Sequence, residues 1–476
     1  MTERRPSVRR ATAWSTSGAI IRMTLNFVGM IILARLVSPG EFGVFAVAAG
    51  VVLLASYLSE IGGSWALIQR PEISPRHVGS ALAFSLTCAA LLMALIYFSA
   101  GGFADLMRMD SVEPVLRAMC LVIPVQAATG VPRALMRRGL AYGSMVRAEL
   151  LAAVVAMVSG ISYALVSPTV YALVLQAVSY QVLTFGMLWW LTDTTKVGFP
   201  SVRASKELMG FAGGQTLYEA IVMFSKNLDT FLIGRVLGAT QLGFYSRAFT
   251  LVFTPLGQVY SAIGSVAFSA MSREQGNPSR LAHMSSQFLL GVGIFISMPL
   301  MIFAPFTREF VAVVLGNAWL ESAPVFHVLV LSASVQALYA NMLWVVQAFG
   351  MMRVQLRVGI LMILINLTGF GAGAVSGQLV WFGAAYLVSS VAGFMYLSRQ
   401  VSRSLGRPVP YFRAIVSLVV VAIAAGEMLH FAARELSSVD ILRLLLLVVT
   451  LVLVMAVCAW RIRHLLPLPR FRISVD

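Results

Sequence analysis

The sequence predicts an all-α integral membrane protein of about fourteen transmembrane helices. Of its 476 residues, 59% are hydrophobic and only 11% are charged, whereas soluble domains are roughly half apolar and about a quarter charged. Apolar runs of about 20 residues, the length that crosses the hydrocarbon of a bilayer, recur along the whole chain. The net charge of +16 comes largely from basic residues in the short segments between these runs. Lipid is therefore expected to be the solvent for most of the surface.

The apolar runs are separated by charged loops or by loops marked with Pro and Gly, and these borders place the helices. The predicted spans are 12–34, 41–60, 77–99, 113–133, 143–166, 169–191, 207–234, 241–268, 283–304, 322–349, 354–375, 378–400, 411–433 and 441–462. The short stretch from Thr307 to Leu315 is predicted to be an interfacial piece. The basic residues before the first span are typical of a signal peptide. The span is nevertheless long enough to cross the bilayer and has no small-residue cleavage site at its end, so we predict that it is retained.

The basic residues predict the topology. Cytoplasmic loops of membrane proteins carry an excess of Lys and Arg. If the N-terminus is cytoplasmic, 25 basic residues fall on the cytoplasmic side and 7 on the other side. The alternation persists to the end of the chain, which favours an even number of helices with both termini cytoplasmic, in a bacterial inner membrane. Because the basic residues do not gather on one face or arm, nucleic-acid binding is not expected.

Catalytic and metal-binding patterns are not found in the sequence. Cys88, Cys120 and Cys458 all lie in apolar runs without CxxC or Cys/His spacing, which predicts small buried side chains rather than a disulfide framework or a metal site. We find no nucleophile–base pair and no phosphate-binding loop. The sequence therefore predicts neither an enzyme nor a bound cofactor.

An internal repeat at an offset of 200 residues is the strongest pattern in the sequence. The segment Arg35-Leu-Val-Ser-Pro-Gly-Glu-Phe-Gly-Val-Phe45 follows the first predicted helix, and Arg235-Val-Leu-Gly-Ala-Thr-Gln-Leu-Gly-Phe-Tyr245 follows the seventh. An interval of six helices gives both copies the same orientation. Parallel repeats are a known plan of transporters, with a cavity between the halves and alternating access by rocking. We predict an N-terminal six-helix bundle at 1–200, a second at 201–405, and a helix pair with a basic cytoplasmic tail at 406–476.

The two repeated segments resemble those of a known family. Leu33-Ala-Arg-Leu-Val-Ser-Pro-Gly-Glu-Phe-Gly43, running on to Arg70, is similar to polysaccharide flippases of the Wzx and polysaccharide-transporter type, and so is Leu237-Gly-Ala-Thr-Gln-Leu-Gly-Phe-Tyr-Ser-Arg-Ala248, running on to Arg273. The motifs cover roughly residues 32–70 and 207–273, within a superfamily that also holds multidrug extruders and the lipid II flippase. The resemblance implies an undecaprenyl-pyrophosphate substrate that bears an oligosaccharide repeat unit, for exopolysaccharide, O-antigen or capsule synthesis. It also suggests a polysaccharide polymerase and export machinery as partners, beside the membrane lipids.

Ionisable residues at membrane depth are candidates for function because they are costly to place there. Arg22 lies near the middle of the first predicted helix, on one arc with Ser15, Gly18 and Asn26. The seventh and eighth predicted helices carry two further polar arcs, formed by Gln215, Glu219, Lys226 and Asp229, and by Arg247, Thr250, Thr254, Gln258 and Ser261. Arg side chains offer paired, charge-assisted hydrogen bonds to phosphate, and amide or hydroxyl groups suit sugars. The predicted substrate contacts are Arg22, Asn26, Lys226, Arg247, Thr254 and Gln258.

The acidic residues of these arcs leave two interpretations open. Asp229 and Arg247 are equally far from the turn between their helices, so they would lie at equal depth and would pair for stability alone. Alternatively, Glu219 and Asp229 bind a proton or Na⁺ that drives transport, or they simply pair with Lys226. Glu149, beside Arg147 at the predicted cytoplasmic end of its helix, is interpreted as part of a surface pair.

Three functions are weighed on these residues. Translocation of a lipid-linked oligosaccharide agrees with basic residues inside the membrane. A cation- or proton-coupled drug antiporter of the same superfamily would require an acidic cavity. A membrane-embedded glycosyltransferase or polymerase would require an acidic catalytic motif or a large loop outside the membrane, and the sequence has neither.

Overall fold

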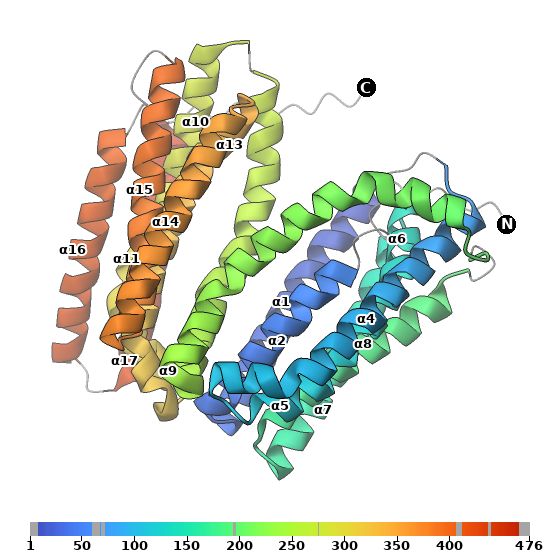
Figure 1. Cartoon of the computed structure of the whole chain (residues 1–476). Coiled ribbons are helices and arrows are strands. Elements are labelled where there is room, and N and C mark those ends of the chain that lie inside the picture. The colour runs from blue at the N-terminus through green and yellow to red at the C-terminus, as the bar shows by residue number, and fades with distance from the viewer. Residues whose placement is uncertain are drawn as a thin grey trace. The chain divides into compact units, whose positions relative to one another are not determined.

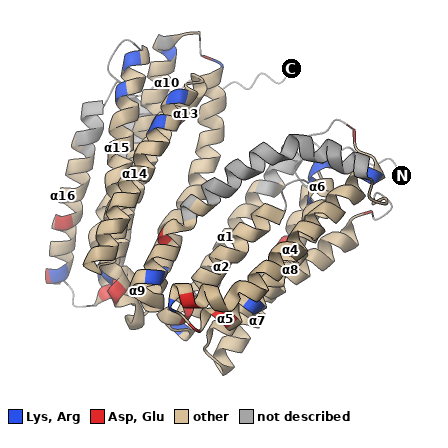
Figure 2. Ribbon diagram, in the orientation of Figure 1, with Lys and Arg blue, Asp and Glu red and all other residues tan. Residues whose placement is uncertain are grey.

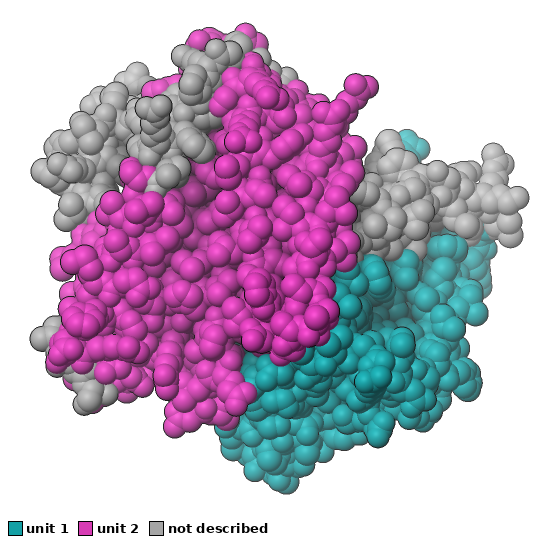
Figure 3. All heavy atoms as spheres, turned by 60° about the vertical axis from the view of Figure 1, so that its left-hand side comes forward, with its two compact units in different colours: residues 1–246 teal, residues 247–476 magenta. Residues whose placement is uncertain are grey.

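The computed structural model describes residues 8–59, 67, 72–193, 197–274, 276–405, 412–436 and 439–465. Secondary structure in these ranges is helical, as expected for a chain that must satisfy its backbone hydrogen bonds inside lipid. The chain divides into two compact units, Met1–Ser246 and Arg247–Asp476 (Figure 3). The predicted division into six-helix bundles at 1–200 and 201–405 stays a prediction.

The described part of the first unit is built mainly from long helices (Figure 1). Its elements are α1 (Val8–Leu36), α2 (Pro39–Ser59), α4 (Pro75–Met107), α5 (Val112–Cys120), α6 (Val122–Arg138), α7 (Tyr142–Val166), α8 (Val170–Leu191) and the first part of α9 (Val202–Ser272). Helix α7 packs against both α1 and α8, and α6 packs against α4 and α8. These contacts bring parts of α1, α6, α7 and α8 around a common space.

The second unit contains the rest of α9 and the helices that follow it. They are α10 (Pro278–Val292), the π-helical turn η2 (Gly293–Ser297), α11 (Met298–Phe303), the 3₁₀ turn η3 (Ala304–Phe306), α12 (Thr307–Val314), the 3₁₀ turn η4 (Asn317–Ser322), α13 (Ala323–Ala348), α14 (Met352–Ser376), α15 (Val380–Leu405), α16 (Phe412–Leu436) and α17 (Asp440–Leu465). Helix α15 packs along both α13 and α14, while α16 lies against α11.

Within the described residues, eleven helical segments are long and apolar enough to cross a membrane. Many large apolar side chains on these helices point outward, among them Phe98, Val166 and Trp190, each more than 80% exposed. Among the described residues, Lys, Arg, Asp and Glu lie mostly near helix ends, with long uncharged stretches between them (Figure 2). This pattern suits a lipid environment and agrees with a multi-pass membrane protein. The total of fourteen spans stays a prediction.

The predicted spans and the observed helices differ at several places. The predicted span 113–133 is two helices, α5 and α6, that change direction at Leu121. The predicted spans 207–234 and 241–268 form the single element α9, whose backbone leaves the helical region at Gly238, with φ 86° and ψ 176°. Such a positive φ favours glycine because it has no Cβ. The predicted interfacial stretch after Pro305 is the short helix α12.

The repeated turns are packed against each other inside the first unit. A Cβ placed on Gly43 would lie 1.8 Å from the carbonyl oxygen of Ala239, and a Cβ placed on Gly243 would lie 1.8 Å from that of Pro39. The two contacts are equivalent in the repeat, because Gly43 corresponds to Gly243 and Pro39 corresponds to Ala239 at the offset of 200 residues. Glycine is therefore required at both positions by a reciprocal contact of backbone on backbone.

Glu41, the acidic residue of the first repeated turn, has a structural role. Its Oε2 accepts a hydrogen bond of 2.8 Å from the backbone N–H of Val170, the first residue of α8. A carboxylate at this position satisfies one of the free N–H groups at the start of α8. Its negative charge also interacts favourably with the positive end of the α8 helix dipole. The start of α2 is thereby fixed to the start of α8.

Candidate functional site

A pocket of about 460 Å³ lies inside the first unit, among α1, α6, α7 and α8. Its size falls in the range of pockets that hold small ligands. The lining residues are Gly18, Ala19, Arg22, Arg133, Arg137, Tyr142, Met145, Val146, Glu149, Leu150 and Tyr180. Three arginines and one glutamate give it a net charge of +2 when all four are ionised.

Helical periodicity places these side chains. Gly18 and Arg22 are one turn apart on α1, and Arg133 and Arg137 are one turn apart on α6, so each pair shares a helix face. On α7, the residues Tyr142, Val146 and Glu149 follow the same spacing. Three helices thus each turn one polar face toward the same space.

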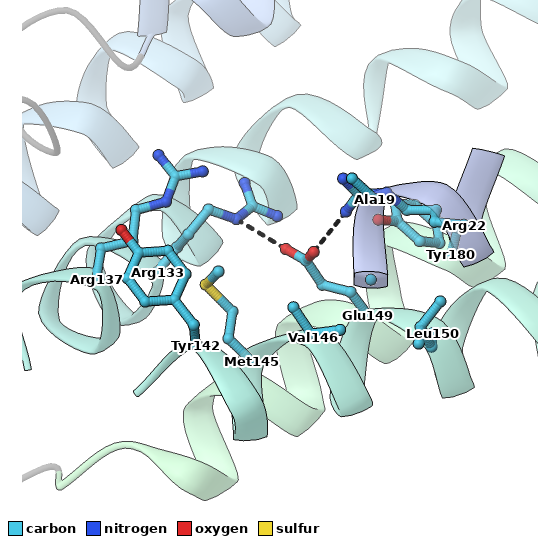
Figure 4. Close-up of a pocket in the computed structure, with 11 residues that line it drawn as sticks. Ala19, Arg22, Arg133, Arg137, Tyr142, Met145, Val146, Glu149, Leu150 and Tyr180 are labelled. Carbon is cyan, nitrogen blue, oxygen red and sulfur yellow. Dashed lines mark hydrogen bonds and ion pairs between the residues drawn. The ribbon is translucent and has the colours of Figure 1, made fainter. Parts of the chain in front are cut away.

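Glu149 lies at the centre of the charged groups, between two arginines (Figure 4). Its Oε2 accepts a hydrogen bond of 2.5 Å from Nη1 of Arg22, and its Oε1 lies 3.5 Å from Nε of Arg133. The Glu149 side chain is 9% exposed, while those of Arg22 and Arg133 are 38% and 22% exposed. One buried carboxylate therefore connects α1, α6 and α7 and leaves both guanidinium groups partly open.

Close helix packing brings Arg22 to Glu149. A Cβ on Gly18 would lie 2.2 Å from Cγ1 of Val146, and a Cβ on Gly29 would lie 2.9 Å from Cγ of Met157. Small residues in membrane helices allow such close approach of the backbones. The distance between α1 and α7 is therefore set by glycine on one side and by branched or long side chains on the other.

The interpretation of Glu149 as part of a surface pair with Arg147 is wrong. Glu149 is buried, and it pairs with Arg22 and Arg133. Arg147 is exposed, donates to the backbone oxygen of Gly143 and lies 5.9 Å from the centre of the Trp14 ring. Positions two residues apart on a helix point in nearly opposite directions, so Arg147 lies on the exposed side and Glu149 on the pocket side.

The predicted site residues on α1 and on the first unit's part of α9 differ in their surroundings. Arg22 lines the pocket, whereas Asn26, one turn further along α1, is exposed and is not among the lining residues. Asp229 is buried; its Oδ2 accepts a 2.5 Å hydrogen bond from the Tyr245 hydroxyl, and its Oδ1 accepts one of 2.7 Å from the backbone N–H of Thr230. The side chains of Glu219 and Lys226 lie outside the described residues.

The remaining predicted residues belong to the second unit. Arg247 is its first residue and is half-buried, while Thr254 and Gln258 are exposed on α9. Their predicted roles in substrate binding stay predictions, as do those of Asn26 and Lys226.

Arg133, Arg137, Tyr142 and Tyr180 were missed as site residues in the sequence. The two arginines were counted as loop charges because they precede a turn, but both lie on α6, which ends at Arg138. Their spacing of four residues, about one helical turn, was the available signal, but the predicted span ended at Arg133. Tyr142 and Tyr180 carry no signal of this kind, because tyrosines are common in membrane helices.

The sequence matches a known protein family and several named proteins. The model of a family described as "Polysaccharide biosynthesis protein" matches residues 32–324. The chain is 24% identical over 323 residues to "Lipopolysaccharide biosynthesis protein WzxC" of Escherichia coli (strain K12), covering 66% of this chain and 65% of that protein. It is 22% identical over 431 residues to "Teichuronic acid biosynthesis protein TuaB" of Bacillus subtilis (strain 168), covering 87% and 86%.

The fold is also found among solved structures. A structure titled "Lipid II flippase MurJ, inward closed conformation" matches with a TM-score of 0.72 at 11% identity, covering 96% of this chain and 99% of that one. At this level of identity the likeness concerns the fold, and function must be argued from the site.

Proposed function

The chain belongs to the polysaccharide biosynthesis protein family, and on this premise we propose that it moves a lipid-linked oligosaccharide across a bacterial inner membrane. The proposed cargo is a polyprenyl diphosphate that bears a sugar repeat unit. The names of the relatives, which refer to lipopolysaccharide and teichuronic acid biosynthesis, support a role in the assembly of a surface polysaccharide.

The observation that carries the proposal is the cationic pocket inside the first unit. A diphosphate diester carries about two negative charges, which must be stabilised away from bulk water. Arg22, Arg133 and Arg137 offer guanidinium groups, which bind phosphate oxygens through paired, charge-assisted hydrogen bonds. The hydroxyls of Tyr142 and Tyr180, which also line the pocket, are suited to phosphate or sugar oxygens.

The position of the pocket suits loading from the cytoplasm. It reaches from the middle of α1 to the end of α6 and the start of α7, where Arg137, Arg138 and Arg147 mark the side predicted to be cytoplasmic. The apolar outer surfaces of the helices allow the lipid tail to remain in the bilayer while only the head group enters the protein.

The energy for transport is proposed to come from the membrane potential, from a coupled ion, or from both. Outward movement of an anion is favoured by an inside-negative potential, by about 2.3 kcal/mol per charge for 100 mV. Glu219 and Asp229 are the proposed ion-coupling residues. The Tyr245 hydroxyl donates a hydrogen bond to the carboxylate of Asp229.

The alternative of a drug antiporter is disfavoured by the charge of the pocket. A cationic drug would be repelled by three arginines in a pocket that is lined by a single glutamate. A cation-binding site would need the opposite balance of charges.

The proposal is tested by removing one pocket arginine at a time in cells whose surface polysaccharide depends on this protein. Arg22→Ala and Arg133→Ala are expected to abolish the polysaccharide while the protein still accumulates in the membrane. Arg117→Ala is the matched control, because Arg117 on α5 is partly exposed and pairs with Glu113 away from the pocket. Normal polysaccharide in both pocket variants would contradict the proposal.

A further inference from the structure

The carboxylate of Glu149 is the one acidic group among the residues that line the pocket. Both of its oxygens are engaged, one by Arg22 of α1 and the other by Arg133 of α6. A phosphate group in this pocket would approach the same two guanidinium groups. Glu149 therefore already makes the contacts with Arg22 and Arg133 that an anionic head group would make.

We propose that Glu149 is a positioning residue that competes with the phosphate for Arg22 and Arg133 and thereby keeps the affinity low enough for release. This inference rests on the proposed function. In the empty pocket the carboxylate holds both arginines in place. When an anion enters, the arginines turn part of their hydrogen bonding toward it, and on release they return to Glu149.

The geometry allows such an exchange. A guanidinium has five N–H donors, and the contacts with Glu149 use one nitrogen of Arg22 and one of Arg133. Both arginine side chains remain partly exposed, so donors are left for a second anion. Arg137 also lines the pocket without an ion pair to any residue in the described part of the chain, so its guanidinium is available to an entering anion.

Competition for the arginines would help a carrier to release its substrate. Binding that is equally tight in every state of a cycle does not speed the step that follows binding. It slows release, because affinity is tuned mostly through the dissociation rate. A fixed negative charge beside the phosphate lowers affinity through repulsion in a partly buried site. The carboxylate also returns the arginines to a paired state, so that release leaves no isolated buried charges.

The inference predicts a gain in binding together with a loss in transport. Glu149→Gln removes the competing charge and keeps the size of the side chain. Purified Glu149→Gln protein is expected to bind a polyprenyl diphosphate in detergent about tenfold more tightly than wild type. It is also expected to flip a fluorescent polyprenyl-diphosphate sugar more slowly in proteoliposomes. A residue with a purely structural role would lower both quantities.

Two further variants and a second probe make the result specific. Glu113→Gln, the matched control, removes a carboxylate from a partly exposed pair on α5 and should change neither quantity. The double variant Glu149→Gln with Arg22→Gln restores the net charge of +2 and should bring affinity back toward wild type. Inorganic pyrophosphate, used as a second probe, should show the same order of affinities if the head group alone is recognised.

The outcomes separate this inference from the proposed function. If wild type binds neither probe, the proposed function fails. If wild type binds and folded Glu149→Gln binds equally or more weakly, Glu149 does not compete with phosphate and the inference is wrong. If Glu149→Gln does not fold, Glu149→Asp decides, because its shorter side chain cannot reach both arginines; a smaller gain in affinity would support the inference, and an unchanged or lower affinity would overturn it.

Discussion

Gly43 and Gly243, 200 positions apart in the chain, lie in a reciprocal contact. Each packs against the backbone of the turn that contains the other, Gly43 on Ala239 and Gly243 on Pro39. A repeat whose two copies touch at equivalent positions implies a local two-fold relationship at this point. The contact consists of backbone on both sides, so neither surface is able to yield by a change of rotamer.

Alanine at either glycine is expected to force the two turns apart. Gly43→Ala and Gly243→Ala should each destabilise the protein by about 1–3 kcal/mol, as overpacking does. The measurement is the midpoint of thermal unfolding in detergent. Gly102→Ala and Gly186→Ala are the controls, because no atom lies within 4 Å of a Cβ there; they should leave stability unchanged or slightly raised. Equal midpoints for both sets would show that the turns are not tightly packed.

Alanine at Gly18 is expected to weaken anion binding through the position of α1. The added methyl group would meet Val146 and move Arg22 away from Glu149. Binding of a polyprenyl diphosphate should fall about tenfold or more, since guanidinium contacts depend on geometry. The second substitution Val146→Ala should restore much of the binding by making room. If Gly18→Ala with Val146→Ala binds no better than Gly18→Ala alone, the packing explanation is wrong.

The pocket arginines are expected to differ in their effects on stability. Arg22→Gln removes a hydrogen bond to a buried carboxylate and should cost about 1–3 kcal/mol of stability as well as binding. Arg137→Gln should weaken anion binding with little change in the unfolding midpoint, because Arg137 makes no ion pair within the described residues. Calorimetric or fluorescence unfolding and binding titrations on the same preparations test this split. A large stability loss in Arg137→Gln would contradict it.

A buried ionic cluster is expected to stabilise the second unit. Oε1 of Glu309 on α12 lies 3.0 Å from Nε2 of His430 on α16 and 3.4 Å from Nη1 of Arg443 on α17. Glu309→Gln should destabilise the protein by about 3–5 kcal/mol, because Arg443 and His430 lose a buried partner. The same change at the exposed Glu321 is the control. Unfolding midpoints that agree between Glu309→Gln and Glu321→Gln would rule out a stabilising role for the cluster.

Part of the candidate site was accessible from the sequence. Arg22 was identified because a lone arginine in the middle of an apolar run is costly there and needs a reason. Glu149 was misread because its charged neighbour in the sequence, Arg147, suggested a surface pair. The partners that Glu149 takes, Arg22 and Arg133, are 127 and 16 positions away on other helices, and no helical periodicity links them to it.

By itself, the sequence determined that the chain is helical, spans a membrane many times and contains a repeated turn. These properties follow from local quantities, since the length of an apolar run and the charge of a loop act on each segment separately. Only the tertiary structure decided which charges meet. The pairing of Arg22 with Glu149 depends on how closely α1 approaches α7, and that distance is set by side-chain packing between segments far apart in the chain.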